Sequence, residues 1–338
     1  MFNKLKENRC YFIAEIGGNF LNFDQAKALI DAAASAGADA IKLQTYRAET
    51  VSSKVAMFDM ENTGVMSQFD LFKKLEIGKE LHKKVFDYAE EKGIDWFSTP
   101  AHPEDVDMLH SLGVCCYKIG ADDATNIPFL RYVAKQGLPI ILSTGMCTMK
   151  EVEEAVSTIE EEGNDKLVIL HTVSGYPTHP ADVNLNNILT LKRRFPHYHI
   201  GFSDHSLATT AAIAAATMGA AVVERHFTID KNAEGPDHML SSTPDEMKLI
   251  IDTVRTIEVM KGSFVKMPFG VEVPNKKNNR KSIIATKPIK KGELLTEENI
   301  FPKRPGSGIE PKYYDIIVGK IATCDIEEDK ILEWSDFK

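Results

Sequence analysis

Strand-like runs and amphipathic helical segments alternate from residue 10 to about residue 262, and this alternation constrains the fold most strongly. The strand-like runs are rich in β-branched and aromatic residues and read CYFIAEIG, AIKLQTY, IDWFSTP, CYKIG, PIILSTG, LVILHTV, HIGFSDH and AVVERHF. The segments between them carry apolar residues at helical spacing, and several end near a glycine. Eight strand-plus-helix units over about 250 residues are typical of a (β/α)₈ barrel. We therefore expect an α/β fold built as a TIM barrel, with an open doubly wound sheet as the second candidate.

The sequence also predicts a second, smaller domain after the barrel. We expect residues 1–265 to form the barrel, residues 266–281 a polar linker, and residues 282–338 a small β-rich module. Within that module, residues 289–300 and 326–337 share a pattern that indicates two related halves, with chance similarity as the alternative. Inside the barrel, the connection over residues 47–78 is unusually long, and such loops in compact domains are more often functional than idle.

Composition and charge argue against several classes of protein. The chain has 338 residues, of which 43% are hydrophobic, so it can bury a substantial core, and its formal net charge of −9 argues against nonspecific nucleic-acid binding. The longest apolar run starts at Ala211 and is shorter than the ~20 residues of a membrane-spanning helix. The five cysteines include no CxxC pair and the first residues lack the apolar core of a signal peptide, so we expect a reducing, cytoplasmic location.

Polar side chains gather where the predicted strands end, which in a TIM barrel is the face that carries the active site. Side chains two apart share one face of a strand, so we expect Lys42 and Gln44 to point into the barrel mouth together. Lys118 comes from another strand, and two buried lysines repel each other unless an anion lies between them. Such an anion is a small phosphorylated acid, and pairing of each lysine with a neighbouring carboxylate is the alternative. Hydroxyl donors come from three further strand ends, Thr99, Ser143 and Ser203.

Two histidines end adjacent predicted strands and are candidate metal ligands. His205 and His226 would lie close enough to share one divalent ion, and imidazole suits Mn²⁺, Co²⁺ or Zn²⁺. Two protein ligands would leave positions for water or a substrate carbonyl, which a Lewis-acid role requires. A hydrogen-bonded histidine without a metal is the alternative. Glu15 and Asp123 are candidates for general acid and base or for hydrogen bonds to a sugar, and spacing alone assigns neither a role.

Nine ordered motifs resemble those of the N-acetylneuraminate (sialic acid) synthase family and together span nearly the whole chain: IAEIGGN, KLQTY, FSTP, YKIG, ILSTGM, GFSDH, ERHFT, GPDH and KRPG. The resemblance implies a TIM barrel followed by an antifreeze-like (SAF) domain. It also implies a transferase that condenses phosphoenolpyruvate with an N-acylated hexosamine and water. In that reaction the phosphoenolpyruvate methylene carbon attacks the open-chain aldehyde, water adds to the resulting oxocarbenium carbon, and phosphate leaves by C–O cleavage.

The resemblance further implies roles for particular residues. A divalent metal, with Mn²⁺ expected and Mg²⁺ or Co²⁺ as alternatives, would be held by His205 and His226 and would polarise the aldehyde. Glu15 and Asp123 would complete the catalytic set, and Glu15 would also contact the sugar. Arg304 would reach the site from the partner subunit of a domain-swapped homodimer. The implied phosphoenolpyruvate contacts are Lys42, Thr99, Lys118, Ser143, Ser174 and Ser203, and the implied sugar contacts are Gln44, Tyr176, Asp237 and Arg304.

The chain departs from the family pattern in the residues near the expected site. After KIG the family usually has a small residue such as serine and, two positions on, a glutamate, where this chain has Ala121 and Asp123. Phe20 stands where histidine is common, and Ser174 stands where asparagine is frequent. These changes leave the reaction class intact but leave the sugar open. It is N-acetylmannosamine, or a 2,4-diacetamido-trideoxyhexose that leads to legionaminic or pseudaminic acid.

Two other functions compete with the synthase hypothesis. Lys42 or Lys118 could be the Schiff-base lysine of a metal-free aldolase, because a desolvated lysine is readily deprotonated. The C-terminal module could instead be the recognition surface of a noncatalytic sugar-binding protein. Its aromatic residues are better explained as packing residues, and they are Tyr313, Tyr314 and Trp334.

Overall fold

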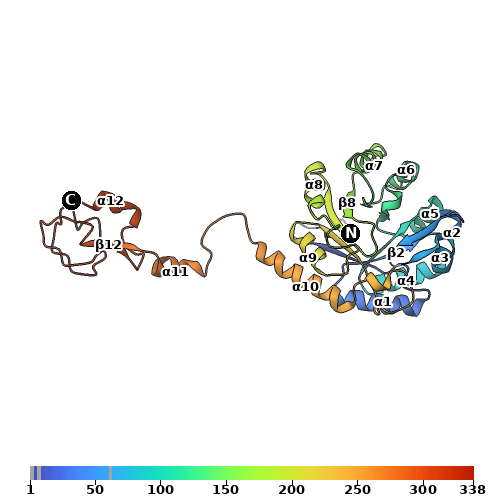
Figure 1. Ribbon diagram of the computed structural model, residues 1–338, viewed down its shortest axis with the longest axis horizontal. Coiled ribbons are helices and arrows are strands. Elements are labelled where there is room, and N and C mark those ends of the chain that lie inside the picture. Colours follow the sequence, from blue (N-terminus) through green and yellow to red (C-terminus); the bar gives the residue numbers. More distant parts are fainter. Residues whose placement is uncertain (1–3, 6–8, 61–62) are drawn as a thin grey trace. The chain divides into compact units, whose positions relative to one another are not determined.

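The computed structural model describes residues 4–5, 9–60 and 63–338, and its contacts divide the chain into two units, Met1–Gly262 and Ser263–Lys338. The first unit is a closed barrel of parallel strands surrounded by helices (Figure 1). Its strands follow the order β1-β10-β9-β8-β7-β6-β5-β2, which confirms the TIM barrel predicted from the sequence. The strands are β1 (Tyr11–Glu15), β2 (Ala40–Thr45), β5 (Asp95–Pro100), β6 (Tyr117–Ile119), β7 (Ile140–Ser143), β8 (Leu167–Thr172), β9 (His199–Asp204) and β10 (Val222–His226).

Each barrel strand is followed by a helix that covers its outer face. The capping residues explain several helix ends: Thr148 and Thr243 each form a capping box at a helix start. Gly37 ends the first helix at a positive φ of 90°, a conformation that favours glycine. The helices are α1 (Phe23–Ala36), α4 (Lys79–Glu91), α5 (Pro103–Leu112), α6 (Ile127–Ala134), α7 (Met149–Glu161), α8 (Asn186–Arg194), α9 (Thr210–Thr217) and α10 (Pro244–Lys261).

Successive side chains of each strand point to opposite faces of the sheet, and this alternation gives the barrel unit two separate hydrophobic cores. One face of each strand packs against the helices, and the other face fills the barrel interior with residues such as Tyr11, Phe97 and Val168. Gly201 belongs to the inward face, where a Cβ atom would lie 2.5 Å from Leu170 Cδ2 and 2.6 Å from the carbonyl oxygen of Val222. The interior is therefore closely packed below the mouth, and the polar inward-facing residues lie toward the C-terminal halves of the strands.

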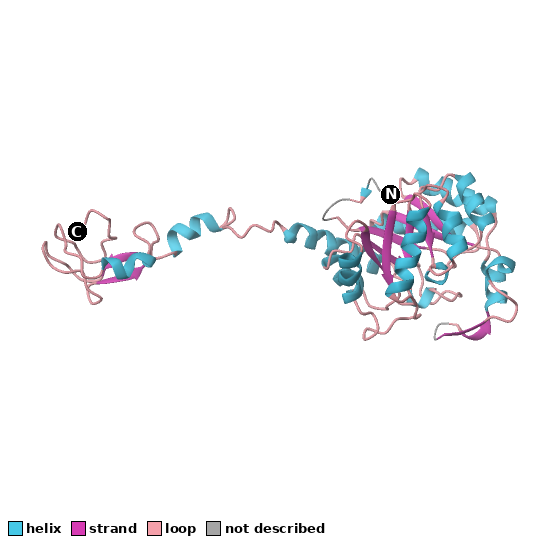
Figure 2. Cartoon of the chain, turned by 90° about the horizontal axis from the view of Figure 1, so that it is seen from above, coloured by secondary structure: helices cyan, strands magenta, loops and turns pink. Residues whose placement is uncertain are grey.

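The long connection over residues 47–78 contains its own elements. These are helix α2 (Ala48–Val51), a hairpin of β3 (Met57–Met60) and β4 (Gly64–Ser67), and helix α3 (Gln68–Leu75). Figure 2 shows the hairpin projecting beyond the helices of the barrel unit. The ring of Phe72 anchors this segment, because it packs edge-on against Tyr46 at 5.0 Å and Phe58 at 5.7 Å between ring centroids.

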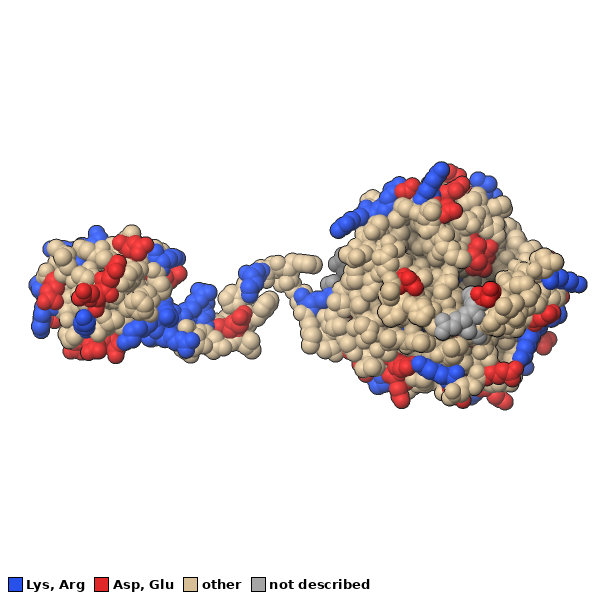
Figure 3. All heavy atoms as spheres, viewed as in Figure 1, with Lys and Arg blue, Asp and Glu red and all other residues tan. Residues whose placement is uncertain are grey.

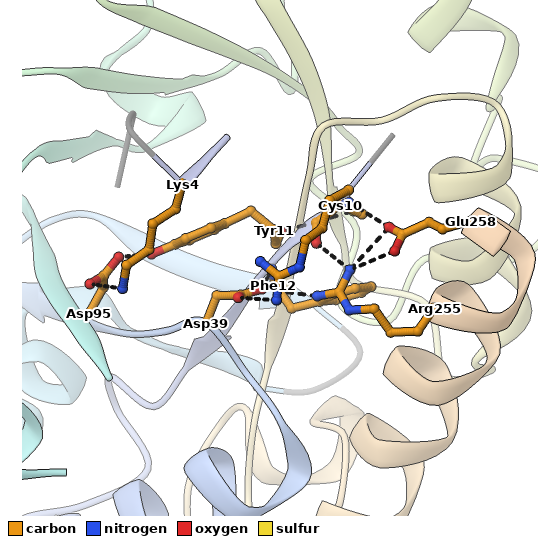
Figure 4. A network of polar contacts seen from close by, with 9 residues as sticks. Lys4, Cys10, Tyr11, Phe12, Asp39, Asp95, Arg255 and Glu258 are labelled. Carbon is orange, nitrogen blue, oxygen red and sulfur yellow. Dashed lines mark hydrogen bonds and ion pairs between the residues drawn. The ribbon is translucent and has the colours of Figure 1, made fainter. Parts of the chain in front are cut away.

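A polar network closes the opposite, N-terminal end of the barrel (Figure 4). Asp39 accepts hydrogen bonds from the backbone N–H of Phe12 at 2.9 Å and from Arg255 Nη2 at 3.3 Å, which ties α10 to β1. Arg255 also donates to the carbonyl of Cys10 at 2.8 Å, while Glu258 accepts from the Cys10 N–H at 2.6 Å. Because α10 follows the last strand, these bonds hold the end of the barrel chain against its beginning.

We expect replacement of Asp39 with alanine to destabilise the barrel by about 2 kcal/mol, because it leaves the buried N–H of Phe12 without its acceptor and removes one of the acceptors of the Arg255 guanidinium. Thermal unfolding followed by circular dichroism measures the effect. The matched control is Asp87→Ala, which removes an exposed carboxylate paired with Lys83 four residues earlier. Equal melting temperatures for the two variants would contradict the structural role of Asp39.

The second unit has its own small core around Ile283, Ile300 and Leu332. It contains α11 (Glu272–Asn279), β11 (Ser282–Ala285), β12 (Ile300–Lys303) and α12 (Tyr314–Ile317). The two similar halves seen in the sequence meet here, since Ile289 and Ile326 exchange backbone hydrogen bonds of 2.8 Å in both directions. The residues expected to form a linker include α11, whose cationic side chains are visible in Figure 3 and are followed by Arg280 and Lys281.

On the face that Figure 3 shows, Lys and Arg side chains alternate with Asp and Glu around the rim of the barrel unit. Within the described ranges, every helix is too short or too polar to cross a lipid bilayer.

Candidate active site

The residues predicted to form the site are brought together because inward-facing strand positions change from apolar to polar at one end of the barrel. In β1 the inward series is Tyr11, Ile13 and then Glu15, and the β1 register places Glu15 opposite both Lys42 and His226. In β2, Gln44 follows Lys42 on the same face and lies opposite Thr99. The buried polar residues collected at the strand ends are Glu15, Lys42, Lys118, Ser143, Ser203, His205 and His226.

Two buried lysines lie on either side of one carboxylate. Lys42 and Lys118 are 4% and 3% exposed, and their Nζ atoms lie 3.9 Å and 3.8 Å from the same oxygen, Oε1 of Glu224. Lys118 Nζ also donates to Ser143 Oγ at 2.7 Å, and Lys42 Nζ donates to Thr99 Oγ1 at 3.1 Å. The lysines and hydroxyls that the sequence predicted as anion ligands therefore form one connected cluster.

Burial and neighbouring charges give the two lysines different proton affinities. Desolvation lowers the pKa of Lys118 to about 8, with Glu224 opposing and Lys42 adding to the effect. Desolvation acts on Lys42 as well, but the carboxylates of Glu15 and Glu224 outweigh it and raise the pKa of Lys42. Lys42 forms an ion pair with Glu15, whose other oxygen accepts the Gly17 N–H at 2.6 Å. Desolvation nevertheless raises the pKa of Glu15 to about 7.

Glu224 is a central member of this cluster that the sequence reasoning missed. It is 5% exposed, accepts a hydrogen bond from Ser203 Oγ at 3.2 Å, and its Oε2 is buried with no hydrogen-bond partner among the described residues. The signal was present, because Glu224 lies two positions before His226 on β10 and must face the same way. The rule that side chains two positions apart share one face of a strand, which grouped Lys42 with Gln44, would also have identified Glu224.

We expect Glu224→Gln to lower the pKa of Lys118 further, because the variant keeps the shape of the side chain but removes its compensating charge. The basic limb of the pH profile for binding of an anion at this cluster should then move down by about one pH unit. Glu161→Gln, at the far end of α7, is the charge-matched control and should leave the limb in place. A Glu224→Gln profile that superimposes on the wild-type curve would remove Glu224 from this role.

His205 and His226 form an aromatic cluster with Tyr176 at the mouth. The ring of Tyr176 stacks on His205 at 4.2 Å, and the two imidazole centroids are 5.5 Å apart. Burial lowers the pKa of both histidines, so both rings are neutral and each retains a lone pair. His205 Nδ1 lies 2.8 Å from the carbonyl oxygen of Val173, so the proton of the neutral ring is on Nδ1 and is donated to that carbonyl. The lone pair of Nε2 is then available to bind a metal.

Two further observations indicate that His205 and His226 fit a divalent metal. His226 Nδ1 is buried and has no hydrogen-bond partner among the described residues, although Asp237 Oδ2 lies 3.8 Å away. Within the part of the chain that the structure describes, no third His, Cys, Asp or Glu joins the imidazoles in a preformed ligand set. Two nitrogen donors with open positions are the arrangement that a substrate-binding metal requires.

Loops after the strands supply the remaining predicted groups. Asp237 is half-buried, and desolvation raises the pKa of its carboxyl to about 6. Ser174 and Ala121 meet over Gly145, where a Cβ atom would lie 2.5 Å from Ser174 Oγ and 3.1 Å from Ala121 Cβ. Ser174 therefore places a hydroxyl beside the position where Ala121 lacks one.

The two aspartates after β6 lie in a short 3₁₀ turn, Ala121–Asp123, and are held differently. Asp123 is half-buried and accepts a hydrogen bond from Asn126 Nδ2 at 2.8 Å. Desolvation raises the pKa of Asp123 to about 6. Asp122 is exposed and turns back over Gly120, where a Cβ atom would lie 2.2 Å from its Oδ1.

Several polar residues at the strand ends face away from the mouth and stabilise the barrel wall. Asp204 forms a buried ion pair with Arg225, and Ser98 lies 2.6 Å from Thr45 Oγ1. His171 Nε2 lies 2.7 Å from the carbonyl of Val183. Arg304 belongs to the second unit, where its Nε donates to the carbonyl of Asn279 at 3.0 Å.

Comparison with known proteins identifies relatives over the whole chain. A model of the NeuB family matches residues 29–266, and a model of the SAF domain matches residues 280–338. The N,N'-diacetyllegionaminic acid synthase of Legionella pneumophila is 38% identical over 334 residues, which cover 96% of this chain and 94% of that protein. The N-acetylneuraminate-9-phosphate synthase of Homo sapiens is 32% identical over 331 residues, covering 96% and 91% respectively. The crystal structure of N-acetylneuraminic acid (sialic acid) synthetase from Leptospira borgpetersenii in complex with citrate is 32% identical, with a TM-score of 0.70 and coverage of 79% of this chain and 90% of that one.

Proposed function

The chain belongs to the NeuB family, and from this premise we propose that it condenses phosphoenolpyruvate with an N-acylated hexosamine and water to give a nonulosonate and phosphate. The observation that carries the proposal is the buried cluster of Lys42 and Lys118 around Glu224, with hydroxyls from Thr99 and Ser143 in hydrogen-bond contact. Such a cluster suits an anion with several oxygens, because the lysines supply charge and the hydroxyls supply neutral donors.

Lys42, Thr99, Lys118, Ser143, Ser174 and Ser203 are the proposed ligands of phosphoenolpyruvate. The two ammonium groups would neutralise its carboxylate and phosphate and would stabilise the charge that accumulates on the departing phosphate. The carboxylate of Glu224 lies close to both lysines and favours their charged forms before the substrate arrives. Burial strengthens these interactions, since the mouth is shielded from water by the barrel wall.

A divalent metal held by His205 and His226 is part of the proposal, with Mn²⁺ expected and Mg²⁺ or Co²⁺ as alternatives. When bound, it would supply Lewis acidity to the aldehyde oxygen of the open-chain sugar. Tyr176 stacks on His205 and keeps that ring in place. The Val173 carbonyl fixes its tautomer, because it accepts the Nδ1 proton.

Three carboxyl groups with raised pKa values are available for proton transfer near neutral pH. Glu15, at about 7, and Asp123, at about 6, are the proposed catalytic acid and base, and each can hold or release a proton in the operating range. Asp237, at about 6, is proposed to bind the sugar together with Gln44 and Tyr176. The sugar is N-acetylmannosamine or a 2,4-diacetamido-trideoxyhexose, in keeping with the products named for the relatives.

We also propose a homodimer, in which Arg304 of one subunit completes the site of the other, and a cytoplasmic location. The segment before the SAF domain supports the dimer, because it carries the exposed apolar side chains Phe264, Val265, Met267, Phe269 and Val271. A row of large exposed apolar residues is a feature of surfaces that bind another protein. Sedimentation velocity of the full chain measures the mass, and a monomer at micromolar concentration would contradict this part of the proposal.

Phosphate release tests the proposed function. Purified protein is incubated with Mn²⁺, phosphoenolpyruvate and each of three sugars, N-acetylmannosamine and the 2,4-diacetamido-trideoxyhexoses that lead to legionaminic and pseudaminic acid. We expect phosphate to appear with one of them and to depend on both substrates. No release with any sugar, or release of phosphate that needs no sugar, would reject the synthase.

A further inference from the structure

Two adjacent cysteines lie directly before β6, at the end of the barrel opposite the mouth. Cys115 is exposed and Cys116 is fully buried, yet their Sγ atoms are only 4.0 Å apart. The Cys115 sulfur also lies 3.7 Å from the carbonyl oxygen of Trp96 on β5, which keeps it beside the barrel wall. An oxidant from solution can therefore reach one sulfur of a pair whose second sulfur is already in contact with the first.

The surroundings of the pair favour a thiolate on Cys115 and a thiol on Cys116. The hydrogen bond between the two side chains lowers the pKa of Cys115, whereas burial raises the pKa of Cys116 well above its usual value. The carboxylate of Asp95 opposes ionisation of both, but it is itself bound by Lys4 Nζ at 2.6 Å and Tyr11 Oη at 2.6 Å (Figure 4). Because the thiolate is the nucleophile, Cys115 is the reactive member and Cys116 is placed to resolve it.

A metal site does not account for the two thiols. Within the part of the chain that the structure describes, no third His, Cys, Asp or Glu joins them in a possible ligand set. Structural zinc sites use four such ligands. In a reducing compartment, disulfides are usually transient and belong to catalytic or redox-sensing cysteines. The contact between an exposed and a buried thiol therefore favours redox chemistry.

Cys116 is connected to the mouth through β6. Side chains two apart share one face of a strand, so Cys116 points into the barrel interior below Lys118. The strand has only three residues and pairs with β5 at one of them, Tyr117, which directly follows Cys116. A disulfide requires a sulfur–sulfur separation of about 2 Å, so Cys116 must turn toward Cys115 and disturb the start of this short strand.

We propose that Cys115 and Cys116 are a reversible oxidation site, in which a hydroperoxide converts the two thiols into one disulfide and displaces the start of the strand that carries Lys118. The Cys115 thiolate attacks one oxygen of hydrogen peroxide, so an S–O bond forms, the O–O bond breaks and the other oxygen leaves as water after protonation. The Cys116 sulfur then attacks the sulfur of this sulfenic acid. The S–S bond forms, and the hydroxyl group leaves as water with the proton of Cys116. Two electrons pass from the thiols to the peroxide, which becomes two molecules of water.

Reversibility follows from the short separation of adjacent residues. Consecutive Cα atoms are about 3.8 Å apart, whereas the Cα atoms of most disulfide-bonded residues are about 4.4–6.8 Å apart. The bond between Cys115 and Cys116 is therefore strained, and strained disulfides are readily reduced. A dithiol reductant restores both thiols by exchange and is itself oxidised to a disulfide.

Thiol counting by mass spectrometry tests the chemistry. The reduced full chain is treated with hydrogen peroxide, denatured, alkylated with iodoacetamide and digested. We expect two of the five cysteines to escape alkylation, both in the peptide that contains Cys115 and Cys116, and both to react again after dithiothreitol. Cys115→Ser should keep all of its remaining thiols. The matched control is Cys324→Ser, which removes a partly exposed thiol that lies 3.7 Å from Asp336 Oδ1, and it should behave as the wild type.

Three outcomes of this experiment would overturn the oxidation site. They are a wild type that keeps all five thiols, a Cys115→Ser variant that still loses two, and a disulfide that joins two chains on a nonreducing gel. Because Cys115 is exposed, its replacement by serine leaves the packing of the barrel interior intact.

Hydrogen exchange tests the displacement of β6 and is independent of enzyme activity. In the oxidised wild type, we expect the backbone amides of Tyr117–Ile119 to exchange about tenfold faster than in the reduced protein, because the start of the strand is disturbed. The amides of β8, which is separated from β6 by β7, should exchange at an unchanged rate. Peroxide should have no effect on β6 in Cys115→Ser. A disulfide that forms while exchange in β6 stays the same would contradict the displacement.

Discussion

Replacement of Lys118 with alanine should lower turnover about 100-fold or more and raise KM for phosphoenolpyruvate. The ammonium group is 3% exposed and contacts Ser143 Oγ at 2.7 Å, so no surface group or solvent ion can take its place. In the proposed reaction, its loss removes a cation that would stabilise the charge on the departing phosphate. It also leaves Glu224 with one lysine instead of two. Initial rates of phosphate release, with each substrate varied in turn, measure both parameters.

The control for Lys118 is an exposed lysine of the same barrel. Lys84→Ala, on the solvent side of α4, should retain wild-type values of kcat and KM. Wild-type kinetics for Lys118→Ala would remove the lysine from the phosphoenolpyruvate site. Borohydride reduction in the presence of pyruvate separates the aldolase alternative, since a covalent adduct on Lys42 or Lys118 would support a Schiff base and contradict the synthase.

The same lysine predicts how substrate affinity depends on pH. Its pKa is lowered to about 8, so the side chain is charged below that pH and loses its proton above it. Loss of this charge should therefore raise KM for phosphoenolpyruvate on the basic side of pH 8. Bound phosphoenolpyruvate favours the charged form of Lys118 and so raises its pKa in the complex. The basic limb of the pH profile of kcat should therefore lie at higher pH than the basic limb of the profile of kcat/KM.

The barrel could be predicted from sequence because its signal is repeated in every unit. Each strand is a short buried run and each helix has an apolar stripe, so an error in one element would not have changed the count. The hairpin of β3 and β4 was not foreseen, since each strand has only four residues and neither has a strong apolar pattern. The helix α11 was also missed, because it has no buried residue and its sequence is polar.

The site could be predicted in part, and strand-face alternation explains both the successes and the misses. Position at a strand end selected Lys42, Lys118, His205 and His226, which are buried at the mouth. The same criterion taken alone also selects Asp204, which faces the helices and pairs with Arg225. Glu224 was missed for the complementary reason, since it lies inside its strand but on the inward face. Contacts such as Asn126 to Asp123 depend on loop geometry that no periodic pattern encodes.

Removal of divalent metal should abolish activity. Dialysis of the purified protein against excess EDTA is expected to stop phosphate release, and Mn²⁺ should restore it. Full activity in excess EDTA would contradict the metal role. Binding is measured independently of activity by Mn²⁺ electron paramagnetic resonance, which should report about one ion per chain.

The histidine variants connect this loss to particular ligands. His226→Ala should lose both the bound Mn²⁺ and the activity, whereas His197→Ala, at an exposed position after α8, should lose neither. The physical reason lies in the state of His226 without metal: its Nδ1 is buried and lacks a hydrogen-bond partner among the described residues. A buried polar atom without a hydrogen-bond partner lowers the stability of the fold by about 1–3 kcal/mol. Burial and the positive charges of neighbouring residues lower the pKa of His226, so its ring stays neutral. The unpaired Nδ1 of His226 is therefore an unfavourable feature of the fold that a bound cation would relieve. If His226→Ala bound Mn²⁺ as tightly as the wild type, the cation would have to bind elsewhere.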